Sequence, residues 1–224
     1  MAAEKRVPLD DIVEFPASEM QQRITAFTDN LLRRRTVRDF DARPVDRAIV
    51  EQAIRAAGSA PSGANHQPWH FCVIQDADKR KALREAAEVE ERAFYEGKAG
   101  EEWLEALRPL GTDADKPFLE TAPVIIAVFA QKRGGERVGQ EKKNYYVNES
   151  VGIACGFMLA AFHEAGLVTL THTPNPMRFL NELCERPETE KPYMLIVAGH
   201  ADANATVPEH ALIKKSVDDI SSWI

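Results

Sequence analysis

The stretch VGIACGFMLAAF, residues 151–162, predicts a helix that is apolar on every side. Small residues are interspersed among the large ones, at Gly152, Ala154, Gly156, Ala160 and Ala161. Small side chains let another backbone approach closely, and little polar surface remains for water. We therefore expect the whole helix, from Asn148 to Ala165, to be fully buried. With two chains, it would form the centre of an obligate dimer.

Strand patterns precede and follow this helix in the sequence. Apolar runs of strand length occur at HFCVIQ (70–75), APVIIAVFAQ (122–131), 168–173 and MLIVAGHA (194–201). Helical patterns separate some of these runs, and no repeat or long low-complexity linker divides the chain. The sequence therefore predicts one α+β domain, residues 1–224, with a mixed central sheet flanked by helices.

Capping patterns predict where several helices begin and end. Ser18 followed by Gln21 three residues later forms a capping box before a helix that ends in a run of arginines. Asp46 can cap a second helix, which Gly58 ends. Asp76 begins a third, strongly charged helical region. Between the second helix and the following strand lies SAPSGANHQPW, whose prolines and small residues predict a loop suited to ligand contacts.

Composition excludes several classes of protein. The net charge of −7, from 35 acidic and 28 basic residues, disfavours a broad nucleic-acid surface. Cys72, Cys155 and Cys184 form no C-x-x-C pair, and the histidines lack metal-ligand spacing and are interpreted as surface or loop residues, so we expect no metal site. No apolar run approaches the roughly 20 residues that cross a bilayer. We expect a cytoplasmic protein without a membrane or nucleic-acid partner.

The segment LLRRRTVRDF, residues 31–40, concentrates basic side chains in this acidic chain. By itself such a run is typical of a solvated helix end whose charges complement the helix dipole. It is followed by a proline, a helix, the loop APSGANHQPW (60–69) and a strand. That combination resembles the nitroreductase-like flavoprotein superfamily, whose members bind FMN. The resemblance implies a domain-swapped homodimer, with a helical arm (1–30) and a C-terminal arm (201–224) that wraps the partner subunit.

The resemblance also implies which residues contact the cofactor. Arginine binds phosphate through parallel charge-assisted hydrogen bonds and favours an electron-rich ring edge. The implied FMN contacts are Arg34, Arg35, Thr36, Arg38, Pro61, Ser62, Gly63, Thr171, His172, Thr173 and Lys214. In this reading His172 contributes its backbone, and the Thr173 hydroxyl donates to flavin N5, where it favours one-electron transfer and makes Thr173 the catalytic residue. Without the resemblance, turn residues and strand threonines are common structural features.

A charged segment narrows the superfamily to one group. VEERAFYEGKAGEEWLEAL contains Glu91 and Tyr95 four residues apart, hence on one helical face, and Lys116 follows. In isolation this pattern is typical of a surface helix. It resembles the active-site lid, here residues 88–116, of the iodotyrosine deiodinases, in which a Glu, a Tyr and a Lys hold the zwitterion of an amino acid. In the same family the Ala64 backbone N–H holds the substrate phenolate.

The function implied is FMN-dependent reductive dehalogenation of halotyrosines by stepwise electron transfer. The substrate would be a halotyrosine or another halophenol, and an external reductant, NAD(P)H or a reductase, would supply electrons. Two alternatives stay open: an NAD(P)H-dependent nitroreductase or quinone reductase, and a flavin- or amino-acid-binding protein without turnover.

Overall fold

The structure, a computed structural model, describes residues 5–134 and 142–224 and separates into two units, Met1–Arg34 and Arg35–Ile224. The first unit contains helix α1 (Ala17–Leu32), in which no residue is buried. The helix begins two residues earlier than the predicted cap implies, with Pro16 rather than Ser18 at its N-cap and no capping side chain. The predicted cap at Ser18 is therefore wrong, because Ser18 already lies inside the first turn. Of the predicted arm 1–30, residues 1–4 lie outside the described residues.

The second unit is built on a five-stranded sheet of order β1-β5-β3-β2, with β4 also paired to β5. The strands are β1 (Phe40–Asp41), β2 (Trp69–Val73), β3 (Val124–Gln131), β4 (Val168–His172) and β5 (Glu190–Ala201). Their ladders are antiparallel, and an isolated parallel bridge joins Thr36 to Thr169. Helices flank this sheet, so the predicted α+β class is confirmed. The predicted mixed sheet is wrong for the named strands, because all of their ladders are antiparallel.

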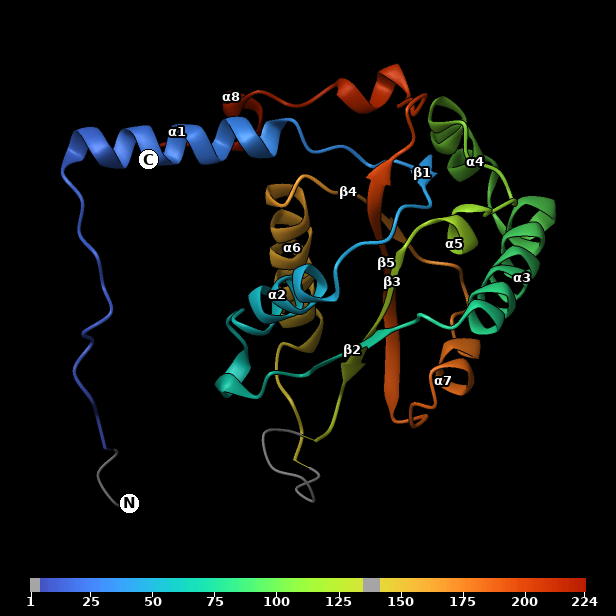
Figure 1. The fold of residues 1–224 in the computed structure, drawn as a ribbon, viewed down its shortest axis with the longest axis horizontal. Helices are drawn as coiled ribbons and strands as arrows, with labels where there is room; N and C mark the ends of the chain where they lie inside the picture. The colour runs from blue at the N-terminus through green and yellow to red at the C-terminus, as the bar shows by residue number, and fades with distance from the viewer. Residues whose placement is uncertain (1–4, 135–141) are drawn as a thin grey trace. The chain divides into compact units, whose positions relative to one another are not determined.

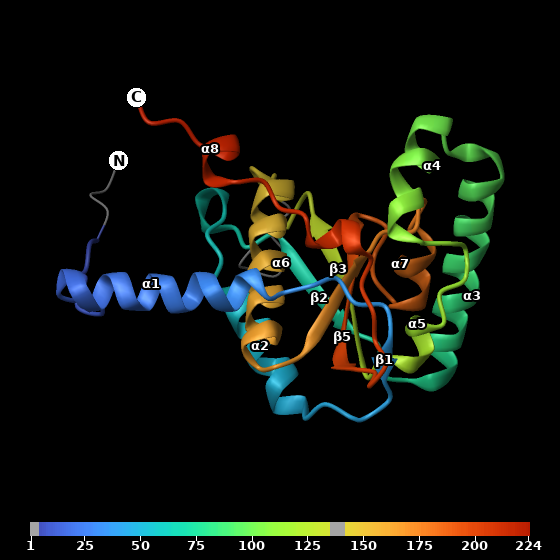
Figure 2. The ribbon, with the colours of Figure 1, turned by 90° about the horizontal axis from the view of Figure 1, so that it is seen from above.

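Helices α2 (Arg47–Gly58) and α6 (Val147–Glu164) cover one face of the sheet (Figure 1 and Figure 2). The Asp46 side chain accepts a hydrogen bond from the Ala48 N–H at 2.8 Å, which confirms the predicted cap. Val50, Ala53 and Ala57 of α2 are buried against the core that α6 shares. The short 3-10 turn η1 (Gly63–Asn65) follows α2.

Only part of α6 is buried in the single chain. Val151, Ala154 and Met158 are inaccessible to solvent, but Ile153 is 41% and Phe157 is 42% exposed. The expectation of a fully buried helix is therefore wrong for one chain. One sheet face and α2 cover a single side of the helix, and its opposite apolar side stays open to solvent.

Helices α3 (Ala77–Ala93), α5 (Phe118–Thr121) and α7 (Phe179–Leu183) cover the other face of the sheet, as Figure 2 shows. Asp76 caps α3 by accepting from the Lys79 N–H at 2.9 Å. Leu83 and Ala87, on the inner face of the helix, are fully buried. The π-helical turn η2 (Phe94–Lys98), α4 (Glu101–Leu107) and the 3-10 turn η3 (Arg108–Leu110) follow.

The chain ends in an extended segment with two short helices, η4 (Glu209–Leu212) and α8 (Val217–Ile220). Its apolar side chains are exposed, with Ile220 at 68% and Trp223 at 92%. Within the parts of the chain that the structure describes, no helix is both long enough and apolar enough to cross a membrane.

Candidate active site

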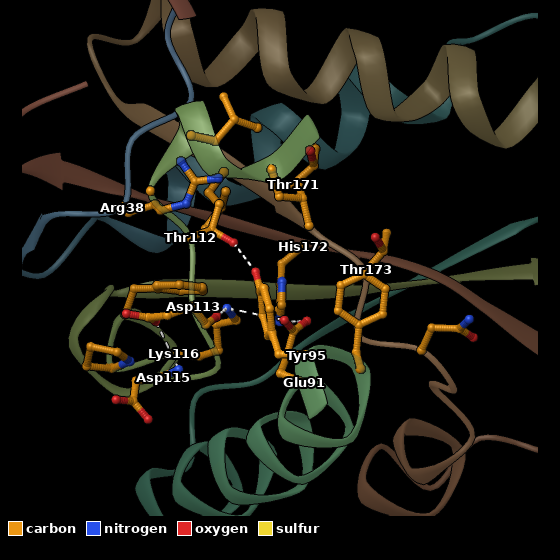
Figure 3. A pocket seen from close by; sticks show the side chains of 18 of the residues that line it. Arg38, Glu91, Tyr95, Thr112, Asp113, Asp115, Lys116, Thr171, His172 and Thr173 are labelled. Atoms are coloured by element: carbon orange, nitrogen blue, oxygen red, sulfur yellow. Dashed lines mark hydrogen bonds and ion pairs between the residues drawn. The ribbon is translucent and has the colours of Figure 1, made fainter. Parts of the chain in front are cut away.

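A cavity of about 670 Å³ lies between the lid segment and the end of strand β4. Its walls come from the last turn of α3 with η2 and α4, from the turn that leads into α5, and from β4 with the residues that follow it. The three predicted substrate-binding side chains, Glu91, Tyr95 and Lys116, all line this cavity (Figure 3). Residues distant in sequence therefore meet at one place.

Glu91 and Lys116 form an ion pair inside the cavity, with 3.3 Å between Oε2 and Nζ. Their side chains are only 14% and 6% exposed. Burial raises the pKa of Glu91 above its ordinary value, although the Lys116 ammonium opposes this shift. The Lys116 ammonium also donates to the carbonyl of Asp113, and its backbone N–H donates to Glu88 at 2.9 Å. Lys116 is thus held at both its backbone and its side chain.

Tyr95 lies just beyond the α-helix that carries Glu91. Helix α3 ends at Ala93, and Tyr95 belongs to the π-helical turn η2, so the two side chains do not share one continuous α-helical face. The Tyr95 hydroxyl shares a hydrogen bond with the Thr112 hydroxyl. The Lys116 ammonium lies 5.8 Å from the centre of the Tyr95 ring. A phenol placed here can donate to an anionic group in the cavity.

His172 is a buried member of the cavity wall, which corrects its interpretation as a surface or loop residue. It is the last residue of β4, and its ring packs edge-on against Phe118 with 5.6 Å between centroids. Nε2 lies 3.9 Å from the Glu91 carboxylate. Burial, together with the positive charges of Lys116 and Arg38, lowers the pKa of His172 to about 3, so the ring is neutral near pH 7.

Part of the predicted cofactor set lies on the same cavity. Arg38, Thr171 and Thr173 line it, and Thr171 and Thr173 are two residues apart and both exposed, as strand alternation requires. Among the described residues, the buried side-chain nitrogen and oxygen atoms without a hydrogen-bond partner are His172 Nε2 and Thr169 Oγ1. The Arg38 guanidinium, the two hydroxyls and the unsatisfied Nε2 of His172, which also lines the cavity, fit the polar edge of a flavin.

The other predicted cofactor contacts are not brought to the cavity within one chain. Pro61, Ser62, Gly63 and Ala64 lie in the loop at η1, which packs on the α6 side of the sheet, away from the lid (Figure 1). There the Gly63 N–H donates to the Ser150 hydroxyl at 3.4 Å.

The η1 loop has an unusual backbone. Ala64, Asn65 and Gln67 adopt positive φ values of 54°, 55° and 49°. Such conformations cost energy for residues other than glycine and persist where the surroundings hold them, often at functional sites. A Cβ at Gly63 would lie 2.5 Å from the Tyr145 carbonyl oxygen, so glycine is required there.

The remaining predicted cofactor residues are not among those that line the cavity. Arg34 belongs to the first unit, whereas Arg35 begins the second. Thr36 is joined to β4 through its bridge to Thr169. Lys214 lies in the C-terminal segment, where its ammonium donates to the Ala211 carbonyl at 3.0 Å.

The sequence analysis missed several contributors to the site. Thr112 and Asp113 bond to Tyr95 and Lys116, and Glu88 anchors the Lys116 backbone. The aromatic rings of Phe94 and Trp103 stack edge-on at 4.9 Å in the lid wall. In the sequence, the many acidic residues of the lid indicate only a solvated surface, so they do not single out these contributors. Within residues 5–134 and 142–224, no group of three or more potential ligands is arranged to hold a metal ion.

Comparison with known proteins gives consistent matches. Residues 31–200 match the Nitroreductase family. The iodotyrosine deiodinase of Haliscomenobacter hydrossis is 47% identical over 88% of this chain and 88% of its own length. Iodotyrosine deiodinase 1 of Homo sapiens is 41% identical over 92% of this chain and 71% of its own length.

Solved structures show the same similarity. A crystal structure of oxidized iodotyrosine deiodinase bound to FMN and 3-iodo-L-tyrosine has a TM-score of 0.72 at 30% identity and covers 85% of this chain and 96% of that one. An FMN- and NADPH-dependent nitroreductase has a TM-score of 0.67 at 21% identity, covers 88% of this chain and 98% of its own, and shares the fold.

Proposed function

The chain belongs to the nitroreductase family and, within it, to the iodotyrosine deiodinases, and we propose that it removes halogen from halotyrosines by FMN-dependent reduction. The observation that carries the proposal is the convergence of Glu91, Tyr95 and Lys116 in one cavity beside Thr171 and Thr173. The cavity volume of about 670 Å³ lies within the usual range for small-molecule sites.

The ion pair in the cavity matches the charges of an amino acid. An α-amino acid carries an ammonium and a carboxylate on a single carbon, and Glu91 and Lys116 present the opposite charges 3.3 Å apart. A bound zwitterion offers its ammonium to Glu91 and its carboxylate to Lys116, so each buried charge exchanges one partner for another. No charge is left unpaired, which keeps the cost of separating the pair low. Tyr95 supplies a further donor to the substrate carboxylate.

The residues that hold FMN in this proposal are those that fit it chemically. Arg38, Thr171 and Thr173 bind its ring edge, and Arg34, Arg35, Thr36 and Lys214 contribute positive charge and hydroxyls toward its phosphate. When bound, FMN supplies the two electrons that convert a halotyrosine and a proton into tyrosine and halide. The Thr173 hydroxyl acts as the catalytic donor toward the ring, and the Ala64 backbone N–H orients the substrate phenolate.

A second copy of the chain completes the site in this proposal. The η1 loop and the lid cavity lie on opposite faces of one sheet, so within a single chain one ligand would not contact both. The exposed Ile153 and Phe157 of α6 provide an apolar surface for a homodimer. Exposed apolar residues of the two arms, such as Phe27 at 53% and Trp223 at 92%, are consistent with arms that wrap a partner.

The proposal extends to the surroundings of the enzyme. An external reductant, NAD(P)H or a reductase, supplies electrons, and a halophenol is a further possible substrate. Three free cysteines agree with a reducing cytoplasm as the location.

Ligand titration and product analysis test the function directly. We expect purified yellow protein to lose flavin fluorescence at micromolar iodotyrosine, and the reduced protein to release one iodide per tyrosine formed under anaerobic conditions. If binding of iodotyrosine depends on the lid residues and binding of ortho-iodophenol does not, the lid is the part of the site that binds the amino-acid group. Rapid nitroaromatic turnover with NADPH and no affinity for iodotyrosine would instead indicate a nitroreductase. Bound flavin and amino acid without any turnover would indicate a binding protein.

A further inference from the structure

His172 presents a buried polar atom to the lid cavity that the proposed clamp of Glu91, Tyr95 and Lys116 does not use. The residue ends β4, lines the cavity, and has a side chain that is only 10% exposed. Its ring points toward Glu91 (Figure 3), and Nε2 has no hydrogen-bond partner among the described residues. Buried polar atoms are paired in the great majority of cases, so an unpaired one in a cavity wall indicates a position where a ligand can bind.

Nε2 of His172 and the Glu91 carboxylate are spaced for a shared ligand. The distance between Nε2 and Oε1 is 3.9 Å, which is too long for a direct hydrogen bond. A nitrogen atom about 2.8 Å from each would meet the two acceptors at an angle of about 90°. The N–H bonds of an ammonium diverge by about 109°, so each hydrogen bond would bend by only about 10°. An ammonium group can therefore donate to both atoms at once.

The His172 ring has the charge state and the support that this contact requires. Burial, with the nearby positive charges of Lys116 and Arg38, lowers the pKa of His172 to about 3. The ring is therefore neutral and keeps one acceptor nitrogen, whereas an imidazolium would only donate and would repel an ammonium. The edge-on contact with Phe118, at 5.6 Å between centroids, supports the orientation of the ring.

We propose that Nε2 of His172 is a second acceptor for the α-ammonium group of the substrate, beside the Glu91 carboxylate. This inference rests on the proposed function and adds a residue to its amino-acid clamp. The ring then carries its proton on Nδ1 and presents the Nε2 lone pair to the cavity. Arg38, Thr171 and Thr173 remain the partners of the flavin edge, and His172 Nε2 is assigned to the substrate because it faces Glu91.

The second acceptor narrows the class of substrate. The clamp then offers two acceptors, on Glu91 and His172, to the ammonium and two donors, on Lys116 and Tyr95, to the carboxylate. A primary ammonium has enough N–H groups for both acceptors, whereas an α-hydroxyl has one hydrogen and an acylated nitrogen has one N–H and no charge. Either group would leave a buried acceptor unpaired, which weakens binding. The site should therefore select free halotyrosines over N-acylated or peptide-linked ones.

The test compares ligands with and without the amino group on the FMN-bound full chain. Flavin fluorescence quenching gives the Kd of iodotyrosine and of its des-amino analogue, which keeps the iodophenol and the carboxylate. His172→Leu retains an apolar contact with Phe118 and removes the acceptor. We expect the Kd of iodotyrosine to rise about tenfold or more, as for loss of a hydrogen bond to a charged group, and the Kd of the analogue to stay within about twofold.

Three further variants separate the acceptor from packing. His172→Gln restores an acceptor oxygen and should recover most of the affinity for iodotyrosine. His172→Phe fills the wall with a ring that has no acceptor, and it provides the same comparison where His172→Leu fails to keep FMN. His200→Leu makes the matched substitution in β5, outside the cavity lining, and should bind both ligands like the parent.

Three results would overturn this inference alone. They are an unchanged Kd for iodotyrosine in His172→Leu, an equal rise in Kd for both ligands, and a His172→Gln protein that binds iodotyrosine as weakly as His172→Leu. A parent protein that holds FMN but does not bind iodotyrosine would overturn the proposed function, and this inference with it.

Discussion

Nζ of Lys116 lies 3.3 Å from Oε2 of Glu91, and both side chains are largely shielded from solvent. The two charges of the proposed substrate clamp are therefore already paired with each other before an amino acid binds. The two residues can be tested separately, because in the proposed function each would contact a different charge of the zwitterion.

Lys116→Gln should weaken binding of iodotyrosine while FMN stays bound. Loss of a hydrogen bond to a charged group costs about 2 kcal/mol, or roughly 30-fold in Kd. The measurement is flavin fluorescence quenching by iodotyrosine, with ortho-iodophenol as a ligand that lacks the zwitterion. Lys98→Gln removes an exposed lid lysine that pairs with Glu90 and should leave both affinities unchanged. An unaltered Kd for iodotyrosine in Lys116→Gln would remove the clamp from the mechanism.

The affinity for iodotyrosine should fall at low pH because of Glu91. Burial raises the pKa of this carboxyl, so protonation begins at a higher pH than for an ordinary glutamate, whose pKa is 4.5. A neutral Glu91 cannot pair with the substrate ammonium, and the Kd should therefore rise as pH falls through the shifted pKa. Glu91→Gln should bind weakly and without this pH dependence. A Kd that changes equally with pH in both proteins would place the titration on another group.

Side-chain caps and apolar runs allowed much of the fold to be predicted from sequence. Asp46 and Asp76 start their helices as expected, because a carboxylate that accepts from the first-turn N–H groups acts locally. Ser18 is not a cap, because the N-cap of α1 is Pro16, two residues earlier. The open side of α6 could not be predicted, since an apolar helix surface does not say which chain covers it.

The cavity could be predicted only in part. Tyr95 was placed by α-helical spacing, yet it lies in a π-helical turn and meets Thr112 through a loop that no periodicity encodes. The burial of His172 depends on β4 pairing with β5 and on Phe118, which are long-range contacts. Residue types indicated the chemistry, whereas their mutual positions required the tertiary structure.

His172 should make the protein less stable in acid. Its folded-state pKa of about 3 lies below the ordinary 6.5. Between these two values the unfolded chain binds a proton at this imidazole and the folded chain does not. Stability is therefore fully present above pH 6.5 and is lost as pH falls toward 3, by about 1.4 kcal/mol per pH unit. His172→Gln should remove this slope, which urea unfolding at pH 7 and pH 5 would measure.

Glu91 acts in the opposite direction and serves as the comparison. A carboxyl with a raised folded-state pKa contributes stability at low pH, which is lost as pH rises through that pKa. Glu91→Gln should therefore not reduce the acid destabilisation. If His172→Gln and the parent lost equal stability between pH 7 and pH 5, the imidazole would not be the group responsible.

Gly63→Ala should destabilise the η1 loop. The new Cβ would lie 2.5 Å from the Tyr145 carbonyl oxygen, a backbone atom that cannot move away cheaply. We expect a loss of about 1–3 kcal/mol in unfolding free energy and weaker retention of FMN. Gly58→Ala is the matched control, because a Cβ at the end of α2 meets nothing within 4 Å and should stabilise the helix slightly. Equal stability of the two variants would contradict the close packing at Gly63.

Phe157→Asp should dissociate the proposed dimer and, at the same time, release FMN. Phe157 is 42% exposed on the open side of α6, where an aspartate is compatible with the folded chain but not with burial against a second chain. Analytical ultracentrifugation should show a monomer, flavin absorbance should be lost, and circular dichroism should be retained. Val89→Asp, on α3 and 58% exposed, carries the same charge change and should remain a yellow dimer. A Phe157→Asp monomer that kept FMN would show that one chain holds the cofactor alone, and the η1 loop would then have no role in binding it.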